Sequence, residues 1–275
     1  MAINKAHSII TRIIFVVFCL ISFEASAQIA TDTSKKVSPL DTLKKQLFTA
    51  PDIVKKLHSN PLSLIPPGIA IVYGASSFFI KPVRNVDYYI HGRIERSNPT
   101  FTSNAETYFL FTPIVMAYGL NFVGVAGKNT FIDRTALLGL SGLFAEISDE
   151  SLKHITHRLR PNEQDYFSFP SGHTTIAFMG AEFLAQEYSE KSPIYTVIGY
   201  TAAVTTGIFR MYNRDHWFSD VVAGAGFGVL STKAAYLVYP YLRNTLTHKG
   251  KNGRSTMIMP MYQDGALGLS FAAKL

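Results

Sequence analysis

Cysteine and charged residues are both scarce in this chain of 275 residues. The only cysteine, Cys19, lies in an N-terminal segment that we expect to be removed, so the mature protein can hold no disulfide. Charged residues make up 16% of the chain and hydrophobic residues 47%. This composition argues against disorder and favours a tightly packed or membrane-associated helical protein. The sequence also contains no internal repeat and no low-complexity tract.

The first 27 residues are predicted to be an export signal. Lys5 and Arg12 supply positive charge, residues 13–23 form a short apolar core, and residues 25–27 form a small-residue cleavage site. The apolar core has about eleven residues, fewer than a membrane-spanning helix needs. We therefore expect cleavage after Ala27 and an exported protein of the cell envelope.

The basic net charge of +7 is compatible with nucleic acid, an anionic lipid surface or a phosphorylated substrate. Export argues against nucleic acid, and the basic residues do not alternate with aromatic ones as they do in many nucleic-acid binders. The expected partners are therefore a membrane and a phosphorylated lipid or small phosphoester.

The remaining sequence divides into three parts by composition. Residues 28–60 are mostly polar and predict a linker with a short helix around 41–57. Residues 61–242 contain apolar runs separated by short polar breaks, and they predict an all-α bundle of about six core helices. Residues 243–275 predict a basic tail that ends in a short extended segment. The apolar runs are 62–80, 107–127, 135–148 (extending to about 158), 174–188, 194–209 and 217–239.

Charged side chains interrupt several of these runs. Glu146, Glu182, Glu187 and Lys233 would be costly if they faced lipid. The helices therefore belong either to a soluble bundle or to short, imperfect membrane spans.

Two features bear on membrane orientation. The basic residues of 243–254 favour a cytoplasmic tail and hence a site on the outer side. A removed export signal is compatible with that orientation only if run 62–80 does not cross the membrane fully. Pro66 and Pro67 interrupt this run near its start. We expect a periplasm-facing membrane protein, with a soluble periplasmic protein as the alternative.

A first candidate motif is KHITHRLRP, residues 153–161. Lys153 and Arg160 are seven residues apart, which is two helical turns, so they are predicted to project from one face of a helix that Pro161 ends. Two basic side chains at a helix end can reach a shared anion. The alternative is a solvated basic face at a membrane boundary.

A second motif is PSGH, residues 170–173. Ser171 is predicted to cap a helix that begins near Thr174, where free backbone N–H groups and the helix dipole favour an anion. Gly172 permits close approach of a ligand to the backbone. His173 can donate a proton to an oxygen of that anion. An ordinary capped helix with a surface histidine is the alternative.

A third motif is RMYNRDHWFSD, residues 210–220. His216 and Asp220 are four residues apart and are predicted to share a helical face. The carboxylate can accept the proton of one ring nitrogen and leave the other nitrogen free to attack. Arg210 adds a planar fork suited to phosphate oxygens. A structural His–Asp pair is the alternative.

The three motifs are predicted to converge. Two antiparallel helices separate the second motif from the third, so the chain leaves and returns to one end of the bundle. One phosphate-like anion would then have several cations, a nucleophile and a proton donor around it.

The spacing K-x6-R-P, P-S-G-H and R-x5-H-x3-D resembles the signature of the type 2 phosphatidic acid phosphatase and vanadium haloperoxidase superfamily. The resemblance covers about residues 130–240, and one departure is Phe209, where the family commonly has serine. It implies a helical bundle that needs no metal or other cofactor.

The resemblance also implies roles for the residues of the three motifs. His216 would form a phosphohistidine, Asp220 would orient it, and His173 would protonate the leaving oxygen and then help to activate water. The phosphate would be held by Lys153, Arg160, Ser171, Gly172 and Arg210.

The expected activity is hydrolysis of a phosphomonoester or pyrophosphate, on a lipid because the helices are apolar. A soluble acid phosphatase of broad specificity is the alternative enzyme. A vanadium haloperoxidase is disfavoured because such chains are usually much longer. A membrane protein that only binds phosphorylated headgroups is the alternative of another class.

Several polar residues near the motifs have weaker interpretations. His154 and His157 do not predict a metal site, because no further ligand accompanies them. For Arg158, Arg214 and Asp215, solvent exposure is favoured over a place at the mouth of the pocket.

Overall fold

The computed structural model describes residues 61–246, 256–263 and 266–273. The predicted export signal, the linker 28–60 with its short helix, and most of the basic tail lie outside the described residues.

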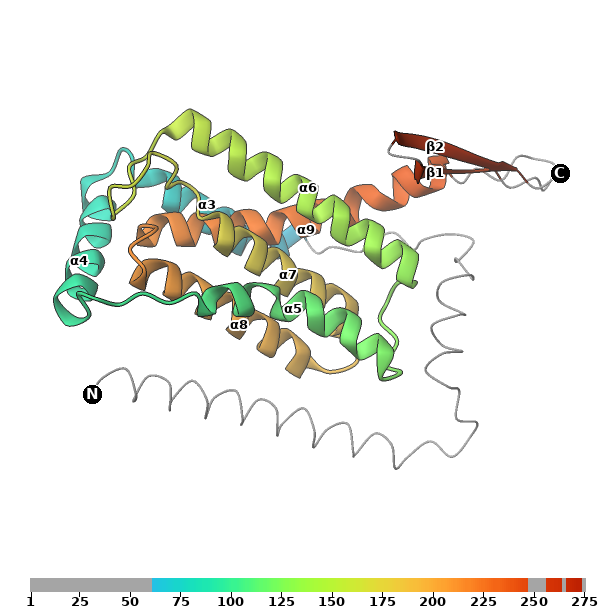
Figure 1. Cartoon of the computed structure of the whole chain (residues 1–275), viewed down its shortest axis with the longest axis horizontal. Coiled ribbons are helices and arrows are strands. Elements are labelled where there is room, and N and C mark those ends of the chain that lie inside the picture. The colour runs from blue at the N-terminus through green and yellow to red at the C-terminus, as the bar shows by residue number, and fades with distance from the viewer. Residues whose placement is uncertain (1–60, 247–255, 264–265, 274–275) are drawn as a thin grey trace, which may run out of the picture.

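The described residues form a bundle of seven α-helices followed by a two-stranded hairpin (Figure 1). An all-α bundle was predicted, and this is confirmed. The elements are η1 (Pro61–Leu64), α3 (Ile65–Ser76), α4 (Lys81–Ser97), α5 (Ala105–Phe122), α6 (Phe131–Thr156), α7 (Gly172–Tyr188), α8 (Pro193–Tyr212), α9 (Phe218–Leu246), β1 (Thr256–Gln263) and β2 (Ala266–Ala273).

Helix starts follow proline and capping residues. Pro66 and Pro67 lie in the first turn of α3, where a missing N–H leaves no hydrogen bond unmade. The side-chain oxygens of Thr130 and Ser192 accept backbone N–H bonds at the starts of α6 and α8. Each of these two residues satisfies a backbone donor that the helix itself cannot.

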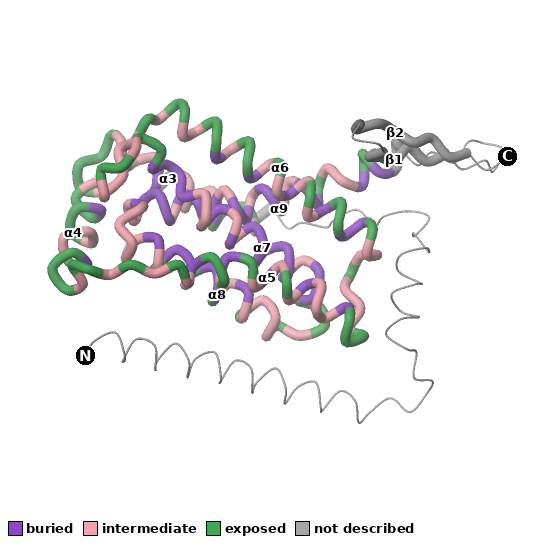
Figure 2. The backbone as a smooth tube through the Cα atoms, in the orientation of Figure 1, coloured by how far each residue is buried: buried purple, intermediate pink, exposed green. Residues whose placement is uncertain are grey.

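Helix α7 is the central element of the bundle. It packs against α5, α6, α8 and α9, while α3 lies along α9. Figure 2 shows α7 as the helix with the most continuous burial. One core cluster fills the space between α5, α6, α7 and α9, and its buried members are Ala117, Leu137, Phe183, Leu184, Tyr188 and Tyr236. A rigid α7 matters for function because the PSGH motif lies at its N-terminus.

About six core helices were expected, and the described residues form seven α-helices. The missed helix, α4, has a mixed polar sequence without a long apolar run, so hydrophobic periodicity did not indicate it. It follows α3 after a bend of 88°. Its Asp87 is buried and reaches the residues of the third motif.

Only one helical stretch among the described residues, Phe218–Arg243, is long and apolar enough by itself to cross a membrane. Over half of its most apolar window is buried inside the bundle. The bent pair Leu62–Ser76 and Lys81–Ser97 passes the same test only when it is counted as one span. Helix α3 alone has 12 residues, about 18 Å, against a hydrocarbon core of roughly 30 Å. The prolines of run 62–80 thus lie in the first turn of a helix too short to cross a bilayer unaided.

The C-terminal extended segment that the sequence predicted corresponds to β2. It pairs antiparallel with β1, from Thr256 opposite Ala273 to Gln263 opposite Ala266. The partner strand β1 was not predicted.

We predict that Gly228→Ala lowers the stability of the bundle by about 1–3 kcal/mol, the usual cost of overpacking. A methyl group at Gly228 would collide with the Thr175 carbonyl oxygen and lie 2.7 Å from the Met179 nitrogen, both in backbone of α7. Thermal unfolding of the purified protein measures the change.

The matched control is Gly139→Ala on the exposed face of α6, where nothing lies within 4 Å of the added methyl group. We expect it to be neutral or stabilising, by up to about 1 kcal/mol. Equal unfolding temperatures for the two variants would show that the α7–α9 contact does not need a glycine.

Candidate active site

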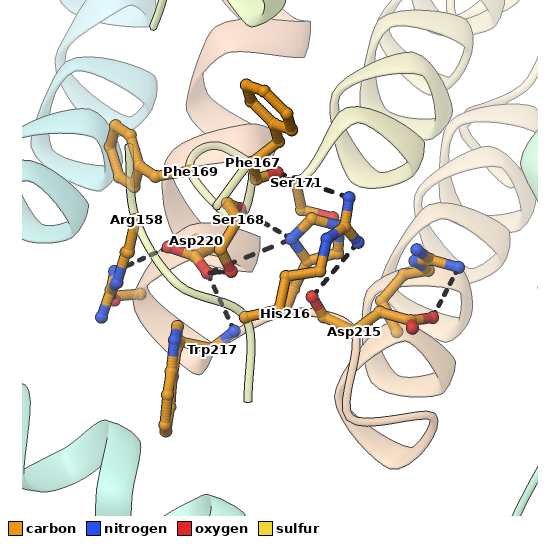
Figure 3. A network of polar contacts seen from close by, with 12 residues as sticks. Arg158, Phe167, Ser168, Phe169, Ser171, Asp215, His216, Trp217 and Asp220 are labelled. Atoms are coloured by element: carbon orange, nitrogen blue, oxygen red, sulfur yellow. Dashed lines mark hydrogen bonds and ion pairs between the residues drawn. The ribbon is translucent and has the colours of Figure 1, made fainter. Parts of the chain in front are cut away.

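The three sequence motifs meet at one end of the bundle (Figures 1 and 3). They occupy the C-terminal end of α6 with the following loop, the N-terminus of α7, and the α8–α9 junction. The backbone N–H of Ser171 donates to the carbonyl of Asp220 over 3.1 Å, which joins the second motif to the third. The predicted convergence of the motifs is therefore present in the fold.

The first motif does not form one continuous helix as predicted. Helix α6 ends at Thr156, and His157 adopts a left-handed conformation with φ 44°. The chain thus leaves the helix before Pro161, and Arg160 reaches the site from a loop. The prediction that Lys153 and Arg160 share one helical face is wrong. The positive charges of both side chains nevertheless act on His173 and His216.

Lys153 lies in the last turn of α6 beside the start of α7. Its Nζ is 2.5 Å from Asp149 Oδ2 and 3.3 Å from Glu150 Oε1. A side chain on Gly172 would lie 2.8 Å from the same Asp149 oxygen and 3.2 Å from Lys153 Nζ. Glycine at this position therefore allows the lysine to approach the backbone of the PSGH turn.

Ser171 occupies the N-cap position of α7, but its side chain makes no capping hydrogen bond. The helix begins at Gly172, two residues earlier than predicted. Ser171 is fully buried, and its hydroxyl is 2.9 Å from that of Thr174. The first-turn N–H groups of α7 are consequently not blocked by a capping side chain.

His216 is held in one tautomer by two neighbours. Its Nδ1 is 2.7 Å from the carbonyl oxygen of Ser168, which can only accept, so Nδ1 carries the proton. Its Nε2 then carries the ring lone pair, which accepts a hydrogen bond from Arg160 Nη1 over 3.3 Å. The side chain is almost entirely buried. This is the arrangement a nitrogen nucleophile requires.

Asp220 does not make the predicted hydrogen bond to His216. Its Oδ2 lies 4.0 Å from Nδ1, because the Ser168 carbonyl takes that proton. Asp220 instead accepts from the Ser168 hydroxyl over 2.6 Å and from the Trp217 N–H over 2.9 Å. It therefore fixes the two segments on either side of the imidazole (Figure 3).

Arg158 is a site residue whose role the sequence did not show. Solvent exposure was favoured, but its side chain is only 13% exposed and pairs with two buried carboxylates. Its Nη1 is 2.6 Å from Asp220 Oδ1, and its Nη2 is 2.7 Å from Asp87 Oδ2. It thereby ties α4 to the start of α9. Its place two residues before Arg160 in a basic motif was the only signal in the sequence.

Arg210, at the end of α8, is paired with carboxylates on two sides. Its Nη1 lies 2.8 Å from Asp215 Oδ2 and 3.3 Å from Glu106 Oε1. Glu106 is a buried residue of α5 that belongs to no motif, so spacing could not indicate it. Asp215 and Arg214 line a cavity beside the site, as the alternative interpretation of these two residues proposed.

The charges of the three predicted cations act on both histidines. Burial, followed by the charges of Arg210, Lys153 and Arg160, lowers the pKa of His173 to about 4. Burial, followed by Arg210 and Arg160, holds the pKa of His216 well below its ordinary value. Both imidazoles are therefore neutral at pH 7 and lie within reach of the same three positive charges.

Comparison with known proteins agrees with this arrangement. A family model described as the PAP2 superfamily matches residues 134–244, so this segment of the chain is similar to that superfamily. The matched segment contains all three motifs.

Two curated relatives and one solved structure are similar to the chain. A lipid A 1-phosphatase of Porphyromonas gingivalis is 45% identical over 86 residues, which are 31% of this chain and 19% of that protein. The phosphatidylglycerophosphatase B of Bacillus subtilis is 29% identical over 128 residues, 40% of this chain and 63% of that protein. Each match spans less than two thirds of the relative's length.

The solved structure is a transmembrane PAP2-type phosphatidylglycerolphosphate phosphatase from Bacillus subtilis. It superposes with a TM-score of 0.48 at 22% identity and covers 64% of this chain and 93% of its own.

We predict that binding of an anion at this site takes up a proton between pH 5 and 6. An anion offsets the charges of Lys153, Arg160 and Arg210, so the pKa of His173 rises from about 4 toward its ordinary value of 6.5. Sulfate, which has no titrating proton in this range, should then bind more tightly as the pH falls from 7 to 5.

Calorimetry in two buffers of different ionisation enthalpy measures the uptake, which we expect to be on the order of half a proton at pH 5.5. The control is His173→Gln, which should bind sulfate with much smaller uptake. Equal uptake by the parent and this variant would assign the proton to another group.

Proposed function

We propose that the protein is a phosphatase that hydrolyses a phosphomonoester or pyrophosphate carried on a lipid, through a phosphohistidine intermediate. The observation that carries this proposal is the environment of the His216 ring. Its Nδ1 proton is held by the Ser168 carbonyl, its Nε2 lone pair faces Arg160 Nη1, and the charges of Arg210, Arg160 and Lys153 all act on the ring.

Each step follows from the placement of the side chains. Nε2 of His216 attacks phosphorus as the bond to the leaving oxygen breaks. His173, which takes up a proton when the anionic substrate binds, gives that proton to the leaving oxygen. His173, now neutral, takes a proton from water, whose oxygen attacks phosphorus and breaks the P–N bond. Inorganic phosphate then leaves, and His216 returns to its starting state.

The three cations serve the transition state. Lys153, Arg160 and Arg210 face the negative charge that develops on the phosphoryl oxygens, and electrostatic stabilisation of this kind is usually the largest catalytic contribution. Arg160 Nη1 lies against Nε2 of His216, so a phosphoryl group that binds Arg160 also frees the nucleophile. The buried hydroxyl of Ser171 and the backbone at Gly172 complete the proposed phosphate site.

A lipid substrate is supported by the surface of the bundle and by the relatives. Val72, Phe79, Tyr108 and Val115 are large apolar residues that are mostly exposed, as suits helices beside lipid. The two curated relatives are named as lipid phosphatases. The two alternative functions are a soluble acid phosphatase and a protein that binds phosphorylated headgroups without catalysis.

We expect His216→Asn to lower phosphate release at least about 10³-fold, because the nucleophile is removed. Phosphatidic acid in mixed micelles serves as the substrate, and rapid quenching of the parent enzyme should trap an acid-labile phosphoenzyme. The matched control is His154→Asn, an exposed histidine at the same end of α6, which should keep the parent rate.

Other results would reject the proposal. A folded His216→Asn variant with the parent rate would exclude the phosphohistidine. A parent protein that binds phosphatidic acid and releases no phosphate would be a headgroup binder, and equal turnover of water-soluble esters without detergent would favour the soluble enzyme.

The site is further proposed to face the periplasm, on the grounds of the predicted export signal and the basic tail. Tyr166 is exposed at the site end, and Glu190 is exposed just beyond the opposite end of α7. Cysteines placed at these positions are chemically unique once the signal with Cys19 is removed. An impermeant maleimide applied to spheroplasts should label Tyr166→Cys and spare Glu190→Cys, whereas the reverse pattern would place the site in the cytoplasm.

A further inference from the structure

A large polar cavity opens beside the proposed phosphate site. Its volume is about 790 Å³, and Pro161 is the only apolar residue among those that line it. The lining comes from four places in the chain: the end of α4, the segment before and at the start of α5, the loop after Pro161, and the α8–α9 junction. The catalytic imidazoles do not line it.

Arg210 forms the boundary between this cavity and the catalytic centre. It lines the cavity, and its Nη1 lies 2.8 Å from Oδ2 of Asp215, the residue that precedes His216 in the chain. A phosphoryl group bound to Arg210 therefore has the imidazoles on one side and the cavity on the other. The alcohol part of a phosphoester whose phosphoryl group binds Arg210 can therefore lie in the cavity.

Glu106 shows that the cavity has an unused binding group. The residue is only 4% exposed and lines the cavity. Its Oε1 accepts from Arg210 and from Asn213, whereas its Oε2 has no hydrogen-bond partner. A buried carboxylate oxygen without a donor is costly. A ligand that brings a hydrogen-bond donor into the cavity would remove that cost.

The other lining groups narrow the chemistry of the ligand. Carboxylates and amides dominate, among them Glu95, Asn104, Asn162 and Asp215, and they offer both donors and acceptors. An acyl chain would leave these polar groups desolvated and unpaired. A second phosphate would face several carboxylates. A neutral group with many hydroxyls satisfies both donors and acceptors, and the volume is in the range that holds a drug-sized ligand.

We infer that this cavity binds the alcohol part of the substrate and selects a phosphomonoester with a polyhydroxylated headgroup, such as a phosphorylated sugar. The inference rests on the proposed phosphatase function and specifies its substrate class. Glu106 and Asn104 are its specificity-determining residues, because both line the cavity and Asn104 makes no side-chain capping bond to its own helix.

A matched pair of soluble esters tests this inference. Glucose 6-phosphate and cyclohexylmethyl phosphate are both phosphates of a primary alcohol on a six-membered ring, and they differ chiefly in the ring oxygen and the hydroxyl groups. We expect kcat/KM to be at least about tenfold higher for glucose 6-phosphate, since its hydroxyl groups can form hydrogen bonds with the polar lining of the cavity.

The variants are read through the ratio of the two kcat/KM values. Glu106→Gln and Asn104→Ala should each lower the ratio several-fold. Any effect of Glu106→Gln that passes through Arg210 acts on the phosphate common to both esters and cancels in the ratio. Glu190→Gln, which removes an exposed carboxylate at the opposite end of α7, should leave the ratio unchanged.

The outcomes separate this inference from the proposed function. Equal turnover of the two esters would overturn the inference and leave the phosphatase standing. Release of phosphate from phosphatidic acid but from neither soluble ester would also count against the cavity. No release from any phosphomonoester, with phosphatidic acid included, would overturn both.

Discussion

Positive charge held against neutral imidazoles is the constraint on which this site depends. Lys153, Arg160 and Arg210 lie around two histidines that burial keeps uncharged. The three positive charges repel one another, and this repulsion is stronger in a buried site than in water. The arrangement is stable only because each cation also has an anionic partner, and it is suited to an anion that can replace those partners during reaction.

The carboxylates that hold the cations come from several parts of the fold. Asp149 pairs with Lys153 from the same helix, Asp165 pairs with Arg160 across a loop, and Glu106 pairs with Arg210 from α5. A fourth basic residue, Arg158, forms ion pairs with Asp87 of α4 and with Asp220. These four basic side chains are thus oriented before substrate arrives, which reduces the reorganisation that catalysis requires.

The backbone contributes as much as the side chains to the orientation of the nucleophile. The carbonyl of Ser168 selects the tautomer of His216. Asp220 does not contact the ring directly but accepts hydrogen bonds from the Ser168 hydroxyl and the Trp217 N–H. A main-chain acceptor of this kind has no residue signature. The sequence pattern R-x5-H-x3-D therefore named residues that lie together in the fold but suggested the wrong hydrogen bond between the last two.

Local pattern was sufficient for the helical class, for most helix positions and for the identity of the phosphate-site candidates, because these depend on periodicity and on spacing within short segments. It missed α4, which has no apolar run, and it extended the helix past His157, where a left-handed residue ends it.

By itself the sequence determined a helical protein with three charged motifs in a fixed order. Only the tertiary structure decided that Glu106, Asp87 and the Ser168 carbonyl join those motifs, and that a polar cavity lies beyond Arg210. The physical reason is that partners from distant segments are chosen by how helices pack, and no single segment carries that information.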